Sequence, residues 1–184
     1  YEADTWAQVE GADFVTKAHV EKAIQKKIYR NSKYEEKLNE MFHEGTLLID
    51  GGDLIQGSGE SVLSQGAIFP PLVNEMSFDL LMPGNWEVIY GKSRMLEVMR
   101  QYKANVIVAN MYDESGGHPL FSPYWITERK GIKLGFLAYN DPEVPIRQNP
   151  GFSEGIRFEP VEANLKQMIS KLKTEDQVDV LFLI

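Results

Sequence analysis

The sequence predicts an α/β sandwich, in which layers of helices cover β-sheets. Short apolar segments of strand length alternate along the chain with segments whose apolar residues follow helical spacing. The first three strand-like segments also end at Gly, Pro or Asn, as expected where a buried strand delivers a loop at its carboxyl end. The 184 residues, 43% of them hydrophobic, suffice for one sizeable core, so we expect a single domain over residues 1–184.

The first half of the chain contains a long helical region followed by alternating elements. Residues 14–42 predict one or two surface helices, because Lys and Glu separate apolar residues at helical spacing: Val20, Ala23, Ile24, Ile28, Tyr34, Leu38, Met41 and Phe42. Thr46–Asp50 then predicts a buried strand that stops at Gly51. The elements expected next are a helix over 72–76, a strand over 79–82, a helix over 95–102 and a strand over 106–109.

The second half predicts a hairpin, a helix and a last strand. Strands over 123–128 and 132–139 flank Arg129-Lys130-Gly131, which is typical of a turn. Residues 160–173 predict an amphipathic helix with Pro in its first turn, and residues 178–184 predict a buried strand. The chain starts at Tyr1 without an export segment and stops at the end of this strand, so we expect that it is incomplete at both ends.

The composition excludes several classes of protein. Nineteen Lys and Arg residues against 27 Asp and Glu residues give a net charge of −8, which disfavours binding to a nucleic-acid backbone. The absence of cysteine excludes disulfides, zinc-thiolate clusters and cysteine nucleophiles. The longest apolar runs are far shorter than the roughly 20 residues that a transmembrane helix needs.

Three loops place an oxygen-bearing side chain where a strand is expected to end: Asp4, Asp53 and Asn85. Oxygen donors on neighbouring strand ends can bind a hard or borderline metal ion. Gly51-Gly52 and Gly84 precede two of these residues and would allow the backbones to approach closely. A single Asp after a strand is more often a turn or capping residue, so the prediction depends on the combination.

The loop motifs resemble those of a known enzyme family. Residues 47–57, LLIDGGDLIQG, and the segment Gly84-Asn85-Trp86-Glu87 are similar to the second and third motifs of calcineurin-like metallophosphoesterases, and more narrowly to their 5'-nucleotidase branch. Similarity continues in order through residues 109–113, 119–124, 131–136 and 155–163. The resemblance therefore covers nearly the whole chain from residue 46 onward.

The resemblance implies a four-layered αββα sandwich, incomplete at both ends, that holds two divalent metals (Mn, Zn or Fe). Asp53 would bridge the two metals, Asn85 would bind the second, and Asp4 would bind the first. Two such cations neutralise phosphoryl charge and lower the pKa of the attacking water. Further residues would orient ligands or contact the substrate: Asp50, Glu87 and Asn110.

Two departures from the family leave the activity open. Trp6 stands where the opening motif has a metal-binding histidine, and Trp86 stands at the position of the catalytic histidine. An indole offers only an N–H donor, so it neither binds a cation through a lone pair nor protonates a leaving group. The run from Trp86 to Gly91, with Trp-Glu followed by Tyr-Gly, resembles the thiosulfohydrolases of bacterial sulfur oxidation.

Three functional hypotheses follow from the resemblance. The first is a 5'-nucleotidase-like hydrolase of phosphate esters, acting on a small phosphoester or nucleotide. The second is a thiosulfohydrolase-like enzyme, and the third is a catalytically silent ligand-binding module. The resemblance also implies a bacterial periplasmic or cell-surface location and a further C-terminal substrate-binding domain. Because few metal ligands are present, we expect the isolated chain to be inactive.

The remaining polar and aromatic residues carry weaker signals. His19, His43 and His118 lie outside every family motif, and we assign them no functional role. Five aromatic residues could form a base-stacking pocket or could pack in the core: Trp86, Tyr90, Phe121, Tyr124 and Trp125.

Overall fold

The computed structural model describes residues 2–55 and 57–184, and within these ranges it leaves out the side chains of residues 30–32 and 34–43. The chain divides into two compact units, Tyr1–Thr46 and Leu47–Ile184, each of which is described by itself. The expectation of a single metallophosphoesterase-like domain over residues 1–184 stays a prediction. In the described part of the chain, no helix combines the length and the apolar composition needed to cross a membrane.

The first unit contains helices α1 (Glu2–Val9) and α2 (Lys17–His43), and α2 confirms the predicted helical region. His19 is buried, with Nδ1 accepting from the Thr16 N–H at 3.0 Å and Nε2 lying 3.2 Å from Glu10 Oε2. These contacts give His19 a structural role. Of the predicted apolar positions of α2 that the structure describes, Val20, Ile24 and Ile28 are exposed and Ala23 is half-buried. The predicted apolar positions Tyr34, Leu38, Met41 and Phe42 have side chains outside the described part.

The second unit begins with a parallel three-stranded sheet in the order β1-β2-β3. Its strands are shorter than predicted: β1 (Ile49–Asp50), β2 (Leu80–Leu81) and β3 (Asn105–Val106). The helices between them are α3 (Gly59–Ser64), α4 (Phe69–Glu75) and α5 (Lys92–Met99). The predicted helices over 72–76 and 95–102 correspond to α4 and α5. Because β1 and β2 are parallel neighbours, the loops that follow them meet at one sheet edge.

A second sheet has the order β5-β6-β8. Strands β5 (Tyr124–Arg129) and β6 (Ile132–Leu137) form the predicted hairpin, and Lys130 and Gly131 both have positive φ (53° and 78°), as a two-residue hairpin turn requires. Strand β8 (Val180–Leu183) runs parallel to β6. Helix α7 (Leu165–Ser170), continued by a π-helical segment over Lys171–Glu175, occupies most of the predicted helix over 160–173.

Several short elements connect the two sheets. Strands β4 (Met111–Asp113) and β7 (Ile156–Phe158) pair in an antiparallel ribbon. Helix α6 (Val144–Arg147) and a 3₁₀ turn, Pro150–Ser153, lie between β6 and β7, and a second 3₁₀ turn, Val161–Ala163, precedes α7.

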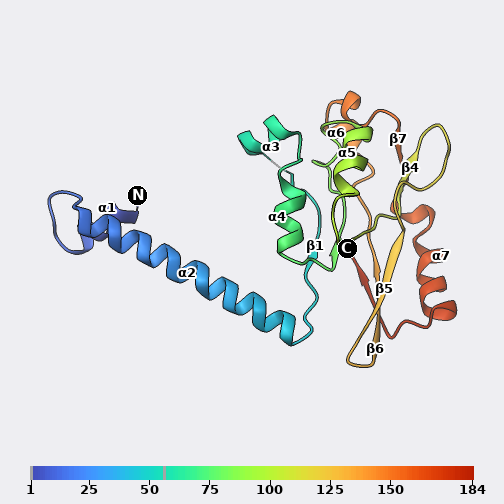
Figure 1. The fold of residues 1–184 in the computed structure, drawn as a ribbon. Coiled ribbons are helices and arrows are strands. Elements are labelled where there is room, and N and C mark those ends of the chain that lie inside the picture. The colour runs from blue at the N-terminus through green and yellow to red at the C-terminus, as the bar shows by residue number, and fades with distance from the viewer. Residues whose placement is uncertain (1, 56) are drawn as a thin grey trace. The chain divides into compact units, whose positions relative to one another are not determined.

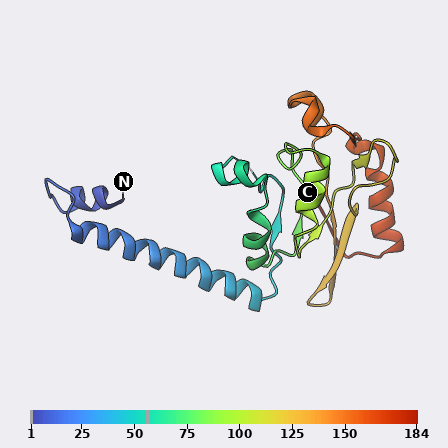
Figure 2. The same cartoon turned by 45° about the horizontal axis from the view of Figure 1, so that its top comes forward.

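Three apolar clusters separate four layers in the second unit. Leu81 packs with residues of α4 and α5, whereas its neighbour Leu80 packs against Phe136 of β6, because successive strand residues face opposite sides of a sheet. Leu137 packs against Leu172 in the third cluster, beside residues of α7. Figures 1 and 2 show strands β1, β5 and β6 between α4 on one side and α7 on the other. This arrangement of helix, sheet, sheet and helix confirms the predicted αββα sandwich.

Candidate metal centre

The loops after β1 and β2 bring Asp53 and Asn85 together. The backbone N–H of Trp86 donates to Asp53 Oδ1 at 3.0 Å, which fixes one carboxylate oxygen of Asp53 against the second loop. The end of the Asn85 side-chain amide that faces Asp53 lies 3.1 Å from each oxygen of its carboxylate. The predicted neighbourhood of these two side chains is therefore present.

Two glycines allow this close approach. A Cβ on Gly52, whose φ is 100°, would lie 2.6 Å from the backbone nitrogen of Gly84. A Cβ on Gly84 would lie 2.2 Å from Asp53 Oδ1. Gly51 has no atom within 4 Å of its hypothetical Cβ, so only Gly52 and Gly84 have the predicted role. Asp53 itself has a φ of 66°, a conformation that costs free energy in a residue with a side chain.

The carboxylate of Glu87 fastens the two loops to each other. Its side chain is 1% exposed, and its Oε2 accepts from the N–H groups of Asp53 (3.0 Å) and Gly84 (2.7 Å). Its Oε1 accepts from the Ile55 N–H at 3.4 Å. Since these donors belong to both loops, Glu87 orients the backbone from which Asp53 and Asn85 project. A role of Glu87 toward a metal or a substrate stays a prediction.

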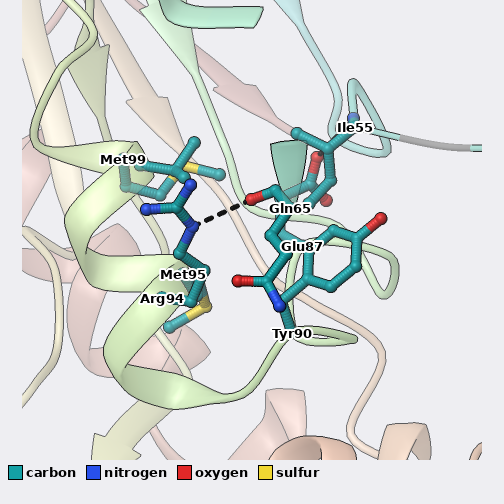
Figure 3. Close-up of a pocket in the computed structure, with 8 residues that line it drawn as sticks. Ile55, Gln65, Glu87, Tyr90, Arg94, Met95 and Met99 are labelled. Carbon is teal, nitrogen blue, oxygen red and sulfur yellow. Dashed lines mark hydrogen bonds between the residues drawn. The ribbon is translucent and has the colours of Figure 1, made fainter. Parts of the chain in front are cut away.

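Glu87 lines a small pocket between the first loop and α5 (Figure 3). Burial raises the pKa of Glu87, although the N–H groups of Asp53 and Gly84 act in the opposite direction. Arg94 does not pair with Glu87, because its Nε and Nη2 donate to the carbonyl oxygens of Gln65 (3.0 Å) and Ser64 (2.8 Å). The pocket is lined by Ile55, Gln65, Glu87, Tyr90, Arg94, Met95, Val98 and Met99.

Asp50 lies at the end of β1, where its Oδ1 accepts from the Gly52 N–H at 2.8 Å. Burial raises the pKa of Asp50, the Gly52 N–H lowers it, and the negative charge of Asp53 raises it further. Asp50 thus supports the turn that leads to Asp53, in agreement with its predicted supporting position.

Two buried asparagines, Asn110 and Asn140, fix the loop that follows β2. Asn110 is fully buried, its Oδ1 accepts from the Asn140 N–H at 2.9 Å, and its Nδ2 donates to the carbonyl oxygens of Asn140 (2.8 Å) and Glu159 (3.0 Å). Asn140 Nδ2 in turn donates to the carbonyl oxygens of Pro83 (2.9 Å) and Gly84 (3.0 Å). Through these bonds Asn110 orients Asn140, and Asn140 orients the loop that carries Asn85.

The donor set fits a divalent cation. If the amide oxygen of Asn85 faces Asp53, it lies against the two carboxylate oxygens of Asp53, and no hydrogen lies between these three acceptors. Such a contact between acceptors is favourable only around a cation. The carboxylate oxygens of Asp53 and the amide oxygen of Asn85 are ligand types that divalent cations bind in proteins. Within residues 2–55 and 57–184, apart from the side chains that the structure leaves out, no cluster of three or more His, Cys, Asp and Glu is arranged to hold a metal.

The expected position of Asp4 is wrong. Residues 2–9 form α1, not a strand. Glu2 and Asp4 lie in its first turn, where negative side chains interact favourably with the positive end of the helix dipole. Asp4 is exposed and accepts from Gln8 Nε2 at 3.2 Å, a pair four residues apart on one helix face. Trp6 of the same helix lies under the Lys22 ammonium, 4.1 Å from the ring centroid to Nζ. A metal-binding role for Asp4 stays a prediction.

The aromatic residues do not line one pocket. Trp125 stacks on Phe136 with centroids 5.4 Å apart, Phe121 packs against the cluster under α4 and α5, and Tyr124 packs in the cluster under α7. For these three residues the core-packing alternative is confirmed. Tyr90 lines the pocket beside Glu87.

Two residues that contact the loop carrying Asn85 were not predicted from the sequence. Asn140 directly follows the predicted strand over 132–139, and this position could have marked it as a residue of a functional loop. Gln148, at the end of α6, donates from Nε2 to the carbonyl oxygen of Asn85 at 2.9 Å, and no sequence pattern marks it.

Comparisons with known proteins find similar sequences and similar structures. A 5'-nucleotidase of Vibrio cholerae is 30% identical over 142 residues, which cover 75% of this chain and 25% of that protein. The structure of the Thermus thermophilus sulfate thiohydrolase SoxB matches with a TM-score of 0.73 and 25% identity, over 81% of this chain and 28% of that chain. The calcineurin-like phosphoesterase YfkN of Bacillus subtilis shares the fold, with a TM-score of 0.67 and 21% identity over 81% and 51% of the two chains.

A family model of a different kind matches the first unit. Residues 1–30 match the model described as archaeal LonB, AAA+ ATPase LID domain. The match is confined to α1 and part of α2. The chain as a whole spans about a quarter of the length of the curated 5'-nucleotidase relatives that it matches.

Proposed function

We propose a function from the premise that this chain is related to the 5'-nucleotidase branch of the calcineurin-like metallophosphoesterases. The protein to which the chain belongs is a metal-dependent hydrolase of phosphate esters, with a nucleotide or another small phosphoester as substrate. Asp53 and Asn85 contribute ligands to its metal centre. The family resemblance also supports a periplasmic or cell-surface location and a further substrate-binding domain as parts of this proposal.

The observation that carries the proposal is the convergence of Asp53 and Asn85. Their facing side-chain atoms lie 3.1 Å apart, on loops that two glycines and one buried carboxylate hold in contact. Bound divalent metals would neutralise phosphoryl charge and activate water. The chain's own residues supply the rigid frame: the Trp86 N–H orients the Asp53 carboxylate, and Glu87 fixes the backbone of both loops.

Metal binding by the 184-residue chain is the first test. The chain is incubated with Mn²⁺, Zn²⁺ or Fe²⁺, desalted and analysed for bound metal, with Asp53→Asn as the variant and the exposed Asp13→Asn as the matched control. We expect bound metal in the wild type and in Asp13→Asn and an at least tenfold lower metal content in Asp53→Asn. Equal metal content in all three proteins would contradict the assignment of Asp53.

A second candidate function is hydrolysis of a sulfur analogue, in the manner of a thiosulfohydrolase. Trp86 favours it, because Trp86-Glu87 followed by Tyr90-Gly91 resembles the thiosulfohydrolases, and an indole cannot protonate a leaving group near neutral pH. Assays of the whole protein on a chromogenic phosphoester and on a thiosulfonate, with and without Mn²⁺, separate the two candidates. Turnover of neither substrate by a metal-loaded protein would favour the silent binding module.

A further inference from the structure

The side chain of Gln148 contacts Asn85 at two points. Its Nε2 donates to the Asn85 carbonyl oxygen at 2.9 Å and lies 2.8 Å from the end of the Asn85 side-chain amide that faces away from Asp53. The bond to the carbonyl oxygen fixes the nitrogen of Gln148 on the Asn85 side. The other end of this amide, Oε1, is buried and has no hydrogen-bond partner among the described residues.

This contact selects one orientation of the Asn85 amide. Because Gln148 presents a donor, the end of Asn85 that faces it must be the acceptor oxygen. The nitrogen of Asn85 then faces Asp53 and donates to both carboxylate oxygens, at 3.1 Å each. In this orientation the Asn85 amide and the Asp53 carboxylate both have hydrogen-bond partners, and only Gln148 Oε1 is left without one among the described residues. A metal ligand needs the opposite orientation, since an amide binds a cation through its oxygen.

We propose that Gln148 is a positioning residue that holds the Asn85 amide with its nitrogen on Asp53 in the metal-free protein. This proposal rests on the metal centre proposed above. Metal binding then requires the Asn85 amide to turn by half a rotation, which places its nitrogen against Gln148. Gln148 must turn as well, so that Oε1 accepts from Asn85 Nδ2 and the bond to the Asn85 carbonyl oxygen is lost. The two amides therefore move together, and Gln148 opposes metal loading.

The test uses Gln148→Met, which keeps the length of the side chain and removes both amide ends. The exposed Gln167→Met on α7 is the matched control, and Gln148→Ala is the second variant if methionine disturbs the fold. Mn²⁺ affinity is measured by calorimetry. Since one hydrogen bond is worth about 0.5–1.5 kcal/mol, we expect Gln148→Met to bind Mn²⁺ about 2–10-fold more tightly than the wild type, with no change in Gln167→Met.

A second readout follows the Asn85 side-chain amide by NMR in the metal-free protein. Its Nδ2 protons should be protected from exchange in the wild type and lose protection in Gln148→Met and in Asp53→Asn. Mn²⁺ binding that is unchanged or weaker in Gln148→Met would overturn this proposal and leave the proposed function intact. If neither the wild type nor the variant binds Mn²⁺, the proposed metal centre fails, and the metal-linked turn fails with it. Unprotected Nδ2 protons in the wild type would overturn the orientation assigned to Asn85.

Discussion

At the scale of a single residue, Glu87 combines burial with backbone contacts to both loops. Its two carboxylate oxygens accept from three N–H groups, those of Asp53, Ile55 and Gly84. Hydrogen bonds to a charged acceptor are stronger than neutral ones, and a buried donor that loses its partner costs more than the bond itself contributes. Glu87 is therefore expected to matter for stability and for metal binding alike.

We predict that Glu87→Gln lowers the free energy of unfolding by about 1–3 kcal/mol, because the amide nitrogen of glutamine faces an N–H group and leaves it without an acceptor. Urea unfolding of the wild type and the variant measures this difference. The exposed Glu75→Gln on α4 is the matched control and should stay within about 0.5 kcal/mol of the wild type. A similarly small change in Glu87→Gln would show that the carboxylate is dispensable to the loops.

The sequence predicts the principal pair of this site and three of the residues around it, but it misses Asn140 and Gln148. Asp53 and Asn85 each follow a recognisable strand, and parallel neighbouring strands deliver their loops to one edge. Gln148 contacts Asn85 across 63 residues of sequence, and Asn140 contacts Gly84 across 56. Such contacts depend on the packing of short loops, which no local pattern of hydrophobic residues specifies.

At the scale of the elements, the contact between the loops after β1 and β2 depends on the absence of a side chain at Gly84. We predict that Gly84→Ala lowers the free energy of unfolding by about 1–3 kcal/mol and weakens Mn²⁺ binding, because its Cβ would lie 2.2 Å from Asp53 Oδ1 and 2.6 Å from the Asp53 nitrogen. Urea unfolding and calorimetry measure the two effects.

Gly51→Ala is the matched control in the same pair of loops. Its Cβ would meet no atom within 4 Å, so we expect a change within about 0.5 kcal/mol and unaltered Mn²⁺ affinity. Equal losses in the two variants would mean that any added methyl group disturbs these loops, and that the close contact at Gly84 is not the cause.

The same scale shows which elements a sequence can predict. Strands β1, β2, β5, β6 and β8 coincide with apolar runs, so hydrophobic patterning finds them. Strands β4 and β7 pair with one another and have three residues each. Three residues are too few to show the alternation of apolar and polar residues that marks a strand. Helix α3 is also short, although Ser58, whose Oγ accepts from the Ser61 N–H at 3.1 Å, gives a capping signal that could have located its start.

At the scale of the second unit, stability depends on contacts that cross from one layer to the next. Tyr139 packs in the cluster between the second sheet and α7, and its hydroxyl donates to Asn164 Oδ1 at 2.6 Å. Asn164 Nδ2 donates to the carbonyl oxygen of Ala109, which follows β3 of the first sheet, at 2.8 Å. This chain of bonds ties three of the four layers together, and its first member is a group that titrates.

Burial raises the pKa of Tyr139 to about 12, with a smaller contribution from the charge of Tyr112. The unfolded chain loses this proton near pH 10, whereas the folded chain keeps it until about pH 12. Between these values the folded state binds more protons than the unfolded state, so stability falls as the pH rises. The contribution is fully present below pH 10 and is lost as the pH passes through about 12.

Tyr139→Phe tests this linkage. At pH 8 we expect the variant to be less stable than the wild type by about 0.5–1.5 kcal/mol, because the bond to Asn164 is lost. As the pH rises from 10 toward 12, the difference in the free energy of unfolding should shrink. Only the wild type has the Tyr139 hydroxyl, whose raised pKa in the folded state makes the folded protein less stable as the pH rises. Urea unfolding at a series of pH values measures the difference, and Tyr29→Phe, an exposed residue of the first unit, should leave the unfolding of the second unit unchanged. A difference between wild type and Tyr139→Phe that stays constant from pH 8 to 12 would show that the hydroxyl of Tyr139 titrates alike in the folded and unfolded chains.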